Sequence, residues 1–297
     1  MAGQARGDDW QLVLIAWGEK YGSADVNALV REVHAQGRGP ARTVLITDRP
    51  RPGLDAGIET RPHPQAFLLP WMKRSGCQAK LGMFAEGVLP TDLPAIFLDL
   101  DTLILGDVAQ LLGAVADDAQ IAILQSAILP FGAVARRLYR LTGGRRYARG
   151  NSSVVVFHPA RCGFIAARFL DLVAQHPNGG FRPLIADERF ISWVAQPRMR
   201  AVPRRLAVKL PTETMFPRLW FGRLYGALPW VRARRGRLVA VTLPGDAVKA
   251  EVLRDLPEGA IVTDRKGRRM EWSDRYLGPL RARLIKALAA TDPAAKG

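Results

Sequence analysis

The sequence predicts an α/β fold in which a mostly parallel central sheet is flanked by helices. Short apolar runs rich in β-branched residues alternate with segments of helical spacing, and a chain of 297 residues suits one large α/β domain. The composition, 48% hydrophobic and 24% charged, excludes a disordered or collagen-like protein. We expect a core of about residues 10–195, an irregular basic C-terminal region of about 196–290 and a frayed tail at 291–297.

The first elements set the parallel arrangement. Gln11–Trp17 is a short apolar run that predicts a buried strand. Ala24–Ala35 has apolar residues at helical spacing and is followed by two glycines, so it predicts a helix. Thr43–Ile46 predicts a second strand. Strand, helix and strand in this order form a βαβ unit, and the two strands of such a unit are parallel.

The remaining elements follow the same patterns. Residues 49–70 are rich in Pro, Gly and Arg and are expected to form a loop. Beyond it the sequence predicts, in chain order, a short helix at Ala79–Phe84, a strand at Ala95–Leu105, a helix at Val108–Ala116, strands at Gln120–Gln125 and Ser153–Phe157, helices at Cys162–Ala174 and Asp187–Val194, and a terminal helix at Arg275–Ala290. Ligands of open α/β sheets bind beyond the carboxyl ends of the strands, so the residues that follow each strand are the candidates for function.

Net charge is the most unusual property of the chain. It has 43 Lys and Arg residues against 27 Asp and Glu, a net charge of +16, which attracts nucleic acid, anionic lipid and phosphorylated small molecules alike. Two cysteines, Cys77 and Cys162, exclude a disulfide framework and a four-cysteine zinc site. No apolar run reaches the ~18–20 residues of a membrane span, and acidic residues precede the first apolar run where a signal peptide would be basic. We therefore expect a cytoplasmic protein.

Two aspartates interrupt the most apolar run of the chain. Asp99 and Asp101 stand two positions apart in Ala95–Leu105, and side chains two apart on a strand point to the same face. Two neighbouring buried carboxylates need a positive partner. Mn²⁺ or Mg²⁺, held by the carboxylates and by substrate phosphates, would supply it. Pairing with arginines at a strand end is the structural alternative.

Two classes of enzyme carry this D-x-D pattern at a strand end. In metal-dependent phosphatases of the haloacid-dehalogenase type the first aspartate is the nucleophile, but Thr102 stands one position too early for their motif and two predicted strands precede it. In nucleotide-sugar glycosyltransferases the motif follows a nucleotide-binding βαβ half, as it does here. The phosphatase stays the alternative enzyme.

Six segments of the chain resemble GT-A glycosyltransferases, nearest to the retaining family 8-like type of glycogenin and bacterial lipopolysaccharide sugar transferases. The resemblance covers about residues 10–195. Its segments, in the order of the family, are Trp17–Gly22 with Val26–Leu29, then Leu45–Asp48, Ala79–Phe84, Phe97–Thr102, Asn151–Phe157 and Asp187–Ile191. It implies a hexosyltransferase that takes its sugar from a nucleotide-sugar donor, expected to be a UDP-sugar, and passes it to a glycan or glycolipid acceptor.

The resemblance also implies roles for individual residues. The base and ribose of the donor would meet Ala16, Trp17, Tyr21 and Asp48, and the donor phosphate would meet Lys80. Asn151 and Asp187 would bind hydroxyls of the donor sugar, and Glu188 stands where the family usually has Gln, near the reactive face of the sugar. Asp187 and Glu188 are therefore the candidate catalytic residues, and Asp99 and Asp101 the metal ligands.

The C-terminal part departs from the family. Relatives carry an F-H-G-x-x-K-P-like segment, whose histidine completes the metal site and whose lysine meets the phosphate. The nearest segment here, Val241–Lys249, keeps Gly245 and Lys249 but has no histidine. Lys249 is the corresponding donor-binding candidate, and Asp246 could replace the missing ligand. A catalytically degenerate fold that binds membranes or polymers is therefore a further alternative.

Basic and aromatic residues concentrate in residues 200–237. Ten Lys and Arg residues stand there against one acid, Glu213, with Trp220, Phe221, Tyr225 and Trp230 among them. This composition is typical of a segment that lies on an anionic membrane surface, so we expect peripheral association with the inner face of the membrane. No nucleic-acid-binding motif is present, and nucleic acid is not an expected partner. A second basic cluster, Arg136 to Arg149, leads directly into Asn151.

Overall fold

The computed structural model describes residues 9–74, 76–115, 121–125, 131–176 and 181–291. The chain divides into two compact units. Unit 1 is made of residues 1–26, 40–100 and 111–202, and unit 2 of residues 27–39, 101–110 and 203–297. The last division along the chain lies after Val202. The first helix, α1 (Ser23–Ala35), begins in unit 1 and ends in unit 2.

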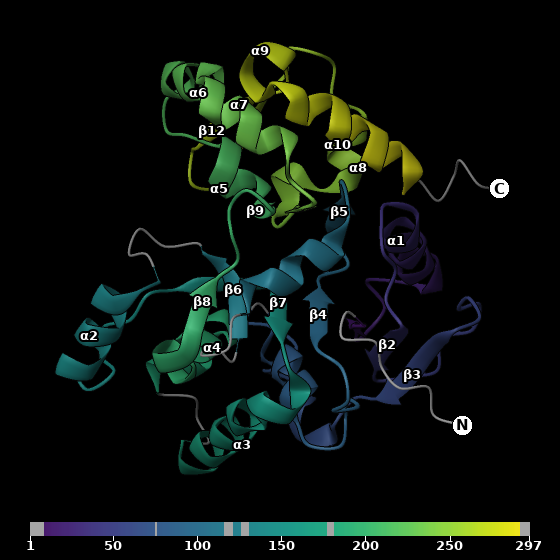
Figure 1. Cartoon of the computed structure of the whole chain (residues 1–297), viewed down its shortest axis with the longest axis vertical. Coiled ribbons are helices and arrows are strands. Elements are labelled where there is room, and N and C mark those ends of the chain that lie inside the picture. The colour runs from purple at the N-terminus through teal and green to yellow at the C-terminus, as the bar shows by residue number, and fades with distance from the viewer. Residues whose placement is uncertain (1–8, 75, 116–120, 126–130, 177–180, 292–297) are drawn as a thin grey trace. The chain divides into compact units, whose positions relative to one another are not determined.

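Unit 1 is built on a sheet that has seven strands in the described residues (Figure 1). In spatial order they are β3 (Ile58–Pro62), β2 (Arg42–Thr47), β1 (Gln11–Ala16), β4 (Ala95–Leu98), β7 (Gly150–Phe157), β6 (Ile121–Gln125) and β8 (Met199–Ala201). The first four are parallel to one another, β8 is parallel to β6, and β7 is antiparallel to both of its neighbours. The central sheet is therefore mostly parallel, as the sequence predicts.

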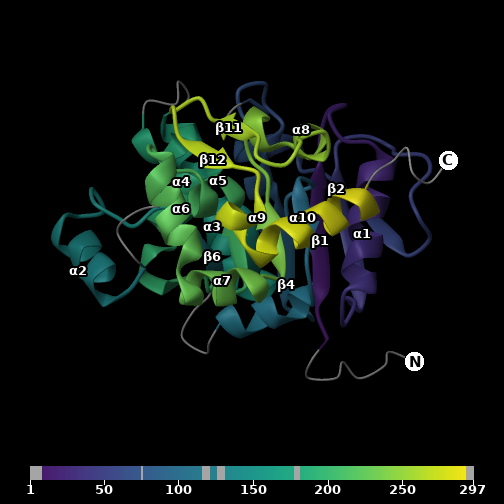
Figure 2. The same cartoon turned by 90° about the horizontal axis from the view of Figure 1, so that it is seen from above.

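One face of this sheet is covered by helices of the same unit. These are the 3₁₀ helix η2 (Gln78–Phe84) and the α-helices α3 (Pro159–Gln175) and α4 (Asp187–Val194). The buried residues of α3 recur every three or four positions and pack on alternate residues of β1, β2, β4 and β7, which form one apolar core. A further helix, α2 (Ala133–Leu141), packs against the 3₁₀ turn η5 (Gln196–Arg198) and lies beyond the β6 end of the sheet (Figure 2).

Unit 2 has its own sheet and its own core. Three short strands, β5 (Thr102–Ile104), β10 (Ala240–Thr242) and β9 (Ala207–Lys209), form one sheet, and β11 (Ile261–Thr263) pairs with β12 (Arg269–Glu271). The helices are α5 (Leu210–Thr214), α6 (Leu219–Ala227), α7 (Pro229–Gly236), α8 (Ala250–Arg254), α9 (Asp274–Leu277) and α10 (Pro279–Ala290). Trp272 and Tyr276 are almost fully buried in this core.

A buried carboxylate ties α5 to α7. Glu213 is 1% exposed and forms ion pairs with Arg234 at 2.7 Å and with Arg235 at 3.0 Å, and Arg204 joins it at 3.0 Å from the surface. Burial raises the pKa of a carboxyl, but the two helical arginines outweigh it and lower the pKa of Glu213. Two basic residues of the segment that the sequence predicts to lie on a membrane surface, Arg234 and Arg235, therefore serve the interior of unit 2 instead.

Several elements differ from the sequence prediction. The predicted loop at 49–70 contains β3, an edge strand whose residues are mostly exposed and therefore show no apolar run. The predicted strand Ala95–Leu105 is two strands, because the chain turns at residues 99–101 and β5 belongs to unit 2. The terminal helix is broken at Gly278, whose φ of 63° suits glycine. Residues beyond 196 hold more regular structure than expected.

Candidate functional site

Three parallel strands of unit 1 bring candidate residues to one edge of the sheet. β1, β2 and β4 run in the same direction, so Trp17, Asp48 and Asp99, each of which follows one of them, lie at the same edge. The antiparallel β7 begins at this edge, and the backbone N–H of Asp99 donates to the carbonyl of Ser153 at 2.9 Å. This is the edge at which open α/β sheets bind ligands.

Lys80 and Asp99 form an ion pair at the centre of this edge. Lys80 comes from η2, and its Nζ lies 2.6 Å from Asp99 Oδ1 and 2.7 Å from Oδ2. Both side chains are largely buried, 11% and 19% exposed. Burial opposes the charge of Lys80, but the carboxylates of Asp99 and Asp187 outweigh it and raise the pKa of Lys80 above its usual value. The lysine is therefore a fixed positive charge between two acidic residues.

Asp187 begins α4 and is held by β7. It is 4% exposed, and its Oδ2 accepts a hydrogen bond of 2.5 Å from the hydroxyl of Ser152. Its backbone N–H donates to the carbonyl of Gly76 at 2.9 Å. Burial raises the pKa of Asp187 to about 6, although Lys80 and Ser152 favour the ionised form. This carboxyl therefore changes its charge near neutral pH.

Glu188 and Asn151 form a second, adjacent pair. Asn151 Nδ2 donates to Glu188 Oε2 at 2.7 Å, and Asn151 Oδ1 accepts from the backbone N–H of Ser153 at 3.2 Å. One turn further along α4, the hydroxyl of Ser192 donates to the carbonyl of Glu188 and accepts from the backbone N–H of Gly150. The start of β7 is thus joined to the first turns of α4 by three side-chain contacts.

The loop after β1 is organised by residues that follow β2. Asp48 accepts from the backbone N–H of Gly18 at 3.1 Å, and Arg51 donates to the carbonyls of Gly18 and Tyr21. Ala16 is buried, Trp17 packs partly buried against the core, and the ammonium of Lys20 lies 4.5 Å from the centre of the Tyr21 ring. The four residues predicted to bind the base and ribose therefore belong to one hydrogen-bonded region of unit 1.

The sequence missed three residues of these networks. Ser152 and Ser192 are buried and bond Asp187 and Gly150, and Arg51 shapes the loop after β1. Ser152 could have been found from the sequence, because a polar residue inside a buried strand needs a hydrogen-bond partner. Arg51 stands in a stretch rich in Arg and Pro, in which nothing marks one arginine as structural.

Two predicted residues belong to unit 2. The carbonyl of Asp101 accepts from the backbone N–H of Leu243, next to β10. Lys249 Nζ lies 3.2 Å from Asp246 Oδ1, and Asp246 also pairs with Arg265. The carboxylate of Asp246, suggested as a replacement ligand, is thus shared by two cations.

The donor set suits a hard divalent cation that is shared with a substrate. Among the described residues no group of three or more His, Cys, Asp and Glu side chains is placed to hold a metal ion. Mg²⁺ in particular keeps several waters and is commonly bound through one or two carboxylates and substrate phosphates. Asp99, in unit 1, is a carboxylate of this kind, and it already bonds Lys80.

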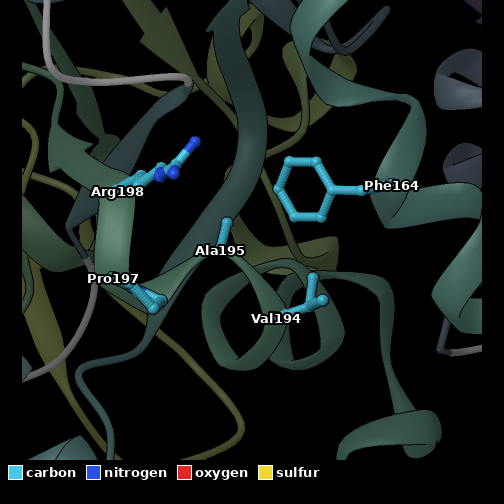
Figure 3. A pocket seen from close by; sticks show the side chains of 5 residues that line it. All are labelled: Phe164, Val194, Ala195, Pro197 and Arg198. Atoms are coloured by element: carbon cyan, nitrogen blue, oxygen red, sulfur yellow. The ribbon is translucent and has the colours of Figure 1, made fainter.

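An apolar pocket lies elsewhere in unit 1. It has a volume of about 330 Å³ and is lined by residues of α3, α4 and η5, namely Phe164, Val194, Ala195, Pro197 and Arg198 (Figure 3). None of the predicted site residues lines it. We therefore place the chemistry at the polar edge of the sheet, where charged groups converge, and not in this pocket.

Solved structures resemble the chain along almost its whole length. The galactosyltransferase LgtC, in complex with donor and acceptor sugar analogues, has a TM-score of 0.55 at 12% identity over 94% of this chain and 95% of that one. An active-site Gln-to-Glu variant of LgtC has a TM-score of 0.56 at 15% identity, with 95% of each chain covered. The bifunctional glycosyltransferase WbbM has a TM-score of 0.56 at 12% identity over 96% of this chain and 52% of that one.

The chain has a GT-A fold. The resemblance seen in the sequence is thereby confirmed at the level of the fold, as is the α/β class with a mostly parallel sheet. The similarity covers residues of unit 2 as well as those of unit 1. No protein-family model and no curated protein matches the sequence. No helix in the described residues is long and apolar enough to cross a membrane.

Proposed function

We propose that the protein is a hexosyltransferase that moves a sugar from a nucleotide-sugar donor, a UDP-sugar, to a glycan or glycolipid acceptor. The observation that supports this most is the Lys80, Asp99 and Asp187 cluster at the ligand-binding edge of a GT-A sheet. LgtC, one of the similar structures, was crystallised with donor and acceptor sugar analogues. The ammonium of Lys80 can bond a phosphate, and the carboxylates can accept hydrogen bonds from sugar hydroxyls.

Donor binding would use the loop after β1 and the lysine. Ala16, Trp17, Tyr21 and Asp48 would contact the base and ribose, and Lys80 would contact the diphosphate. Lys80 is suited to this because its ammonium stays charged at every physiological pH. Lys249 is proposed as a second phosphate contact from unit 2.

A divalent cation, Mn²⁺ or Mg²⁺, would be held by Asp99 and Asp101. Its chemistry would be to neutralise the charge of the departing nucleotide. Lys80, which pairs with Asp99, would bring its ammonium to the same phosphate groups. This chain's own residues thus supply two oxygen ligands and one ammonium at the leaving group.

The donor sugar would be bound by Asn151, Asp187 and Glu188. In the ionised form Asp187 accepts hydrogen bonds from sugar hydroxyls, and Ser152 keeps its carboxylate oriented. Glu188 is oriented by Asn151 and would stabilise positive charge that develops on the sugar. Transfer with retention of configuration is the outcome that the resemblance to family 8-like enzymes favours.

The two alternatives predict different behaviour. A D-x-D phosphatase would release phosphate from small phosphoesters and would bind no nucleoside. A catalytically degenerate fold would bind membranes or polymers and would leave a nucleotide sugar intact. The GT-A fold favours the transferase over the phosphatase, and only activity separates the transferase from the degenerate fold.

A thermal-shift screen of nucleotide sugars, with and without Mn²⁺, tests the proposal. A ligand that binds only the folded state raises the melting temperature. We expect UDP and one UDP-sugar to stabilise the protein, and Mn²⁺ to increase the effect. Lys80→Ala should weaken UDP binding by about 1.5–3 kcal/mol, the worth of one charge-assisted contact, and leave uridine binding unchanged.

Matched variants sharpen this test. Lys73→Ala removes an exposed lysine of the same unit and should leave both ligands unaffected. Asp99→Asn and Asp101→Asn should remove the effect of Mn²⁺ and abolish transfer. Equal losses of UDP and uridine in Lys80→Ala, or wild-type transfer in either aspartate variant, would contradict the assigned roles.

The protein is further proposed to work in the cytoplasm at the inner face of the membrane. The described part of unit 2 exposes large apolar residues on α6 and α7, including Trp220 at 60%, Leu224 at 62% and Trp230 at 66%. Exposed arginines lie on or beside the same helices, namely Arg218, Arg223, Arg232 and Arg237. Aromatic and basic side chains together favour an anionic bilayer surface.

A further inference from the structure

An arginine surface in unit 1 leads into the candidate site. Residues 131–150 contain no acidic residue, and six arginines stand among them: Arg136, Arg137, Arg140, Arg145, Arg146 and Arg149. Arg136 is half-buried and the other five are exposed. In the described part of the chain, no ion pair joins any of the six to a carboxylate. We call these six residues the arginine surface.

The segment that carries this surface is fixed to the site. The backbone N–H of Ala148 donates to Gln196 Oε1 at 2.5 Å, and that of Gly150 donates to Ser192 Oγ at 2.9 Å. Gly144 lies against the indole of Trp193, which leaves no room for a side chain there. Because Ser192 and Trp193 belong to α4, the end of the segment, which carries Arg149, is fixed to the helix that begins with Asp187 and Glu188.

Two further arginines converge on the same place. Arg182 comes from the 3₁₀ helix η4 (Arg182–Ile185) and Arg189 from α4, and both act with Arg149 on the hydroxyl of Tyr147. Burial raises the pKa of Tyr147, and the three guanidinium groups oppose this rise by favouring the phenolate. Three segments of unit 1 thus direct positive charge to one region.

We propose that the arginine surface binds phosphate groups carried by the acceptor, so that the acceptor is a phosphorylated glycan. This inference rests on the proposed transferase function. Gathering guanidinium groups without acids costs free energy, which an anionic ligand would recover. The planar guanidinium donates two parallel hydrogen bonds to a phosphate. Arg149 stands two residues before Asn151, so a phosphate bound there would lie beside the sugar-binding residues.

The side chains between these arginines argue against RNA as the ligand. The exposed large apolar residues of α2 are Val134 and Leu141, at 70% and 74%, and neither is aromatic. Tyr139 and Tyr147 are half-buried. Single-stranded nucleic acid is bound on exposed aromatic rings, which the described residues of this segment lack. Arg149 stands close to Asn151 in the chain, so the arginines favour a ligand that also reaches the sugar-binding residues, and a membrane surface is left as an outcome of the test.

Binding of phosphorylated dextrin, compared with the same dextrin after phosphatase treatment, tests the inference. The two glycans differ only in phosphate. We expect the wild-type protein to bind the phosphorylated form at least tenfold more tightly in titration calorimetry. The triple variant Arg137→Gln, Arg146→Gln and Arg149→Gln should lose that preference. The control variant Lys73→Gln, Arg74→Gln and Arg161→Gln removes the same charge from other exposed positions of unit 1 and should keep it.

Further measurements distinguish a failure of this inference from a failure of the proposed transferase function. UDP binding, which does not involve these arginines, should be equal in all three proteins, and its absence from the wild type would overturn the proposed function itself. Normal UDP binding with no preference for the phosphorylated dextrin, or an equal preference in the triple variant, would overturn the inference alone. Tighter binding of phosphatidylglycerol vesicles or of single-stranded RNA, lost in the triple variant, would assign the arginine surface to that partner instead.

Discussion

Asp187 gives the site a dependence on pH in two measurable ways. Its pKa of about 6 lies above that of an unfolded-state aspartate, about 3.9, so the folded protein binds the extra proton between these values. The free energy of unfolding therefore falls as the pH rises from about 4 to about 6, by roughly 2–3 kcal/mol. Asp187→Asn should remove this cost and be more stable than the wild type above pH ~6. Urea unfolding at acidic and neutral pH measures it.

Ser152 provides the matching test on activity. If ionised Asp187 binds the donor sugar, the wild-type rate should rise with pH through about 6. Ser152→Ala removes a hydrogen bond that favours the carboxylate, so the rising limb should move to higher pH, and Ser152→Thr should restore it. A purely structural role for Ser152 would lower the rate at all pH values without moving the limb.

The sequence predicts the role of some residues and not of others. Lys80 and Asp99 come from segments that match a family pattern, and the structure brings them into contact. Ser152 and Arg51 act through contacts with residues far along the chain or in a separate loop, which no local pattern encodes. Arg234 and Arg235 are the opposite case. Their charge predicts that they are exposed to solvent, but they pair with the buried Glu213.

Among the elements, α6 depends on glycine for its packing. A Cβ atom at Gly222 would overlap the hydroxyl of Tyr276, and one at Gly226 would overlap the backbone carbonyl of the same residue. Tyr276 is fully buried and its hydroxyl donates to the carbonyl of Thr214 at 2.9 Å, so it has little freedom to move. Gly226→Ala should therefore cost about 1–3 kcal/mol of stability.

Gly163→Ala is the control for this prediction. It lies in α3, where the nearest atom to a new Cβ, the carbonyl oxygen of Phe84, would be 3.9 Å away. Alanine favours a helix over glycine by about 0.8–1 kcal/mol, so this variant should be neutral or more stable. Thermal unfolding of the two variants tests this prediction. Equal melting temperatures for Gly226→Ala and Gly163→Ala would show that α6 and α9 are not closely packed.

Elements with a long apolar run could be predicted, and the others could not. β1, β2, β6 and α4 have the positions that hydrophobic spacing indicates. β3 is an exposed edge strand without an apolar run. α2 has its apolar residues gathered on one side, but no helix was predicted there. Strands of three residues in unit 2 are too short to show a recognisable alternation of apolar and polar residues.

The charge of the whole molecule predicts a salt-dependent association with anionic membranes. Trp220→Ser with Trp230→Ser should reduce sedimentation with phosphatidylglycerol vesicles, because both rings are exposed beside arginines. Arg232→Gln with Arg237→Gln should do the same by about 1 kcal/mol per residue, and high salt should mimic it. Arg234 and Arg235 are unsuitable for this test, since removing them would leave Glu213 buried without its partners.

Val252→Ser supplies the control for membrane association. Val252 is an exposed apolar residue of α8, 41% exposed, with fewer arginines around it in sequence. It should leave vesicle binding unchanged. If the wild-type protein sediments no better with anionic than with neutral vesicles, the basic and aromatic residues of α6 and α7 are an ordinary solvated surface.

The position of β7 in the sheet has a consequence for protein synthesis. This strand joins β4 to β6, yet it begins only at Gly150, long after β4 has ended at Leu98. A chain that grows from the ribosome therefore carries β4 as an apolar edge strand, able to pair with neighbouring chains, until β7 emerges. The long insertion between β4 and β7 therefore lengthens the time for which this apolar edge stays unpaired during synthesis.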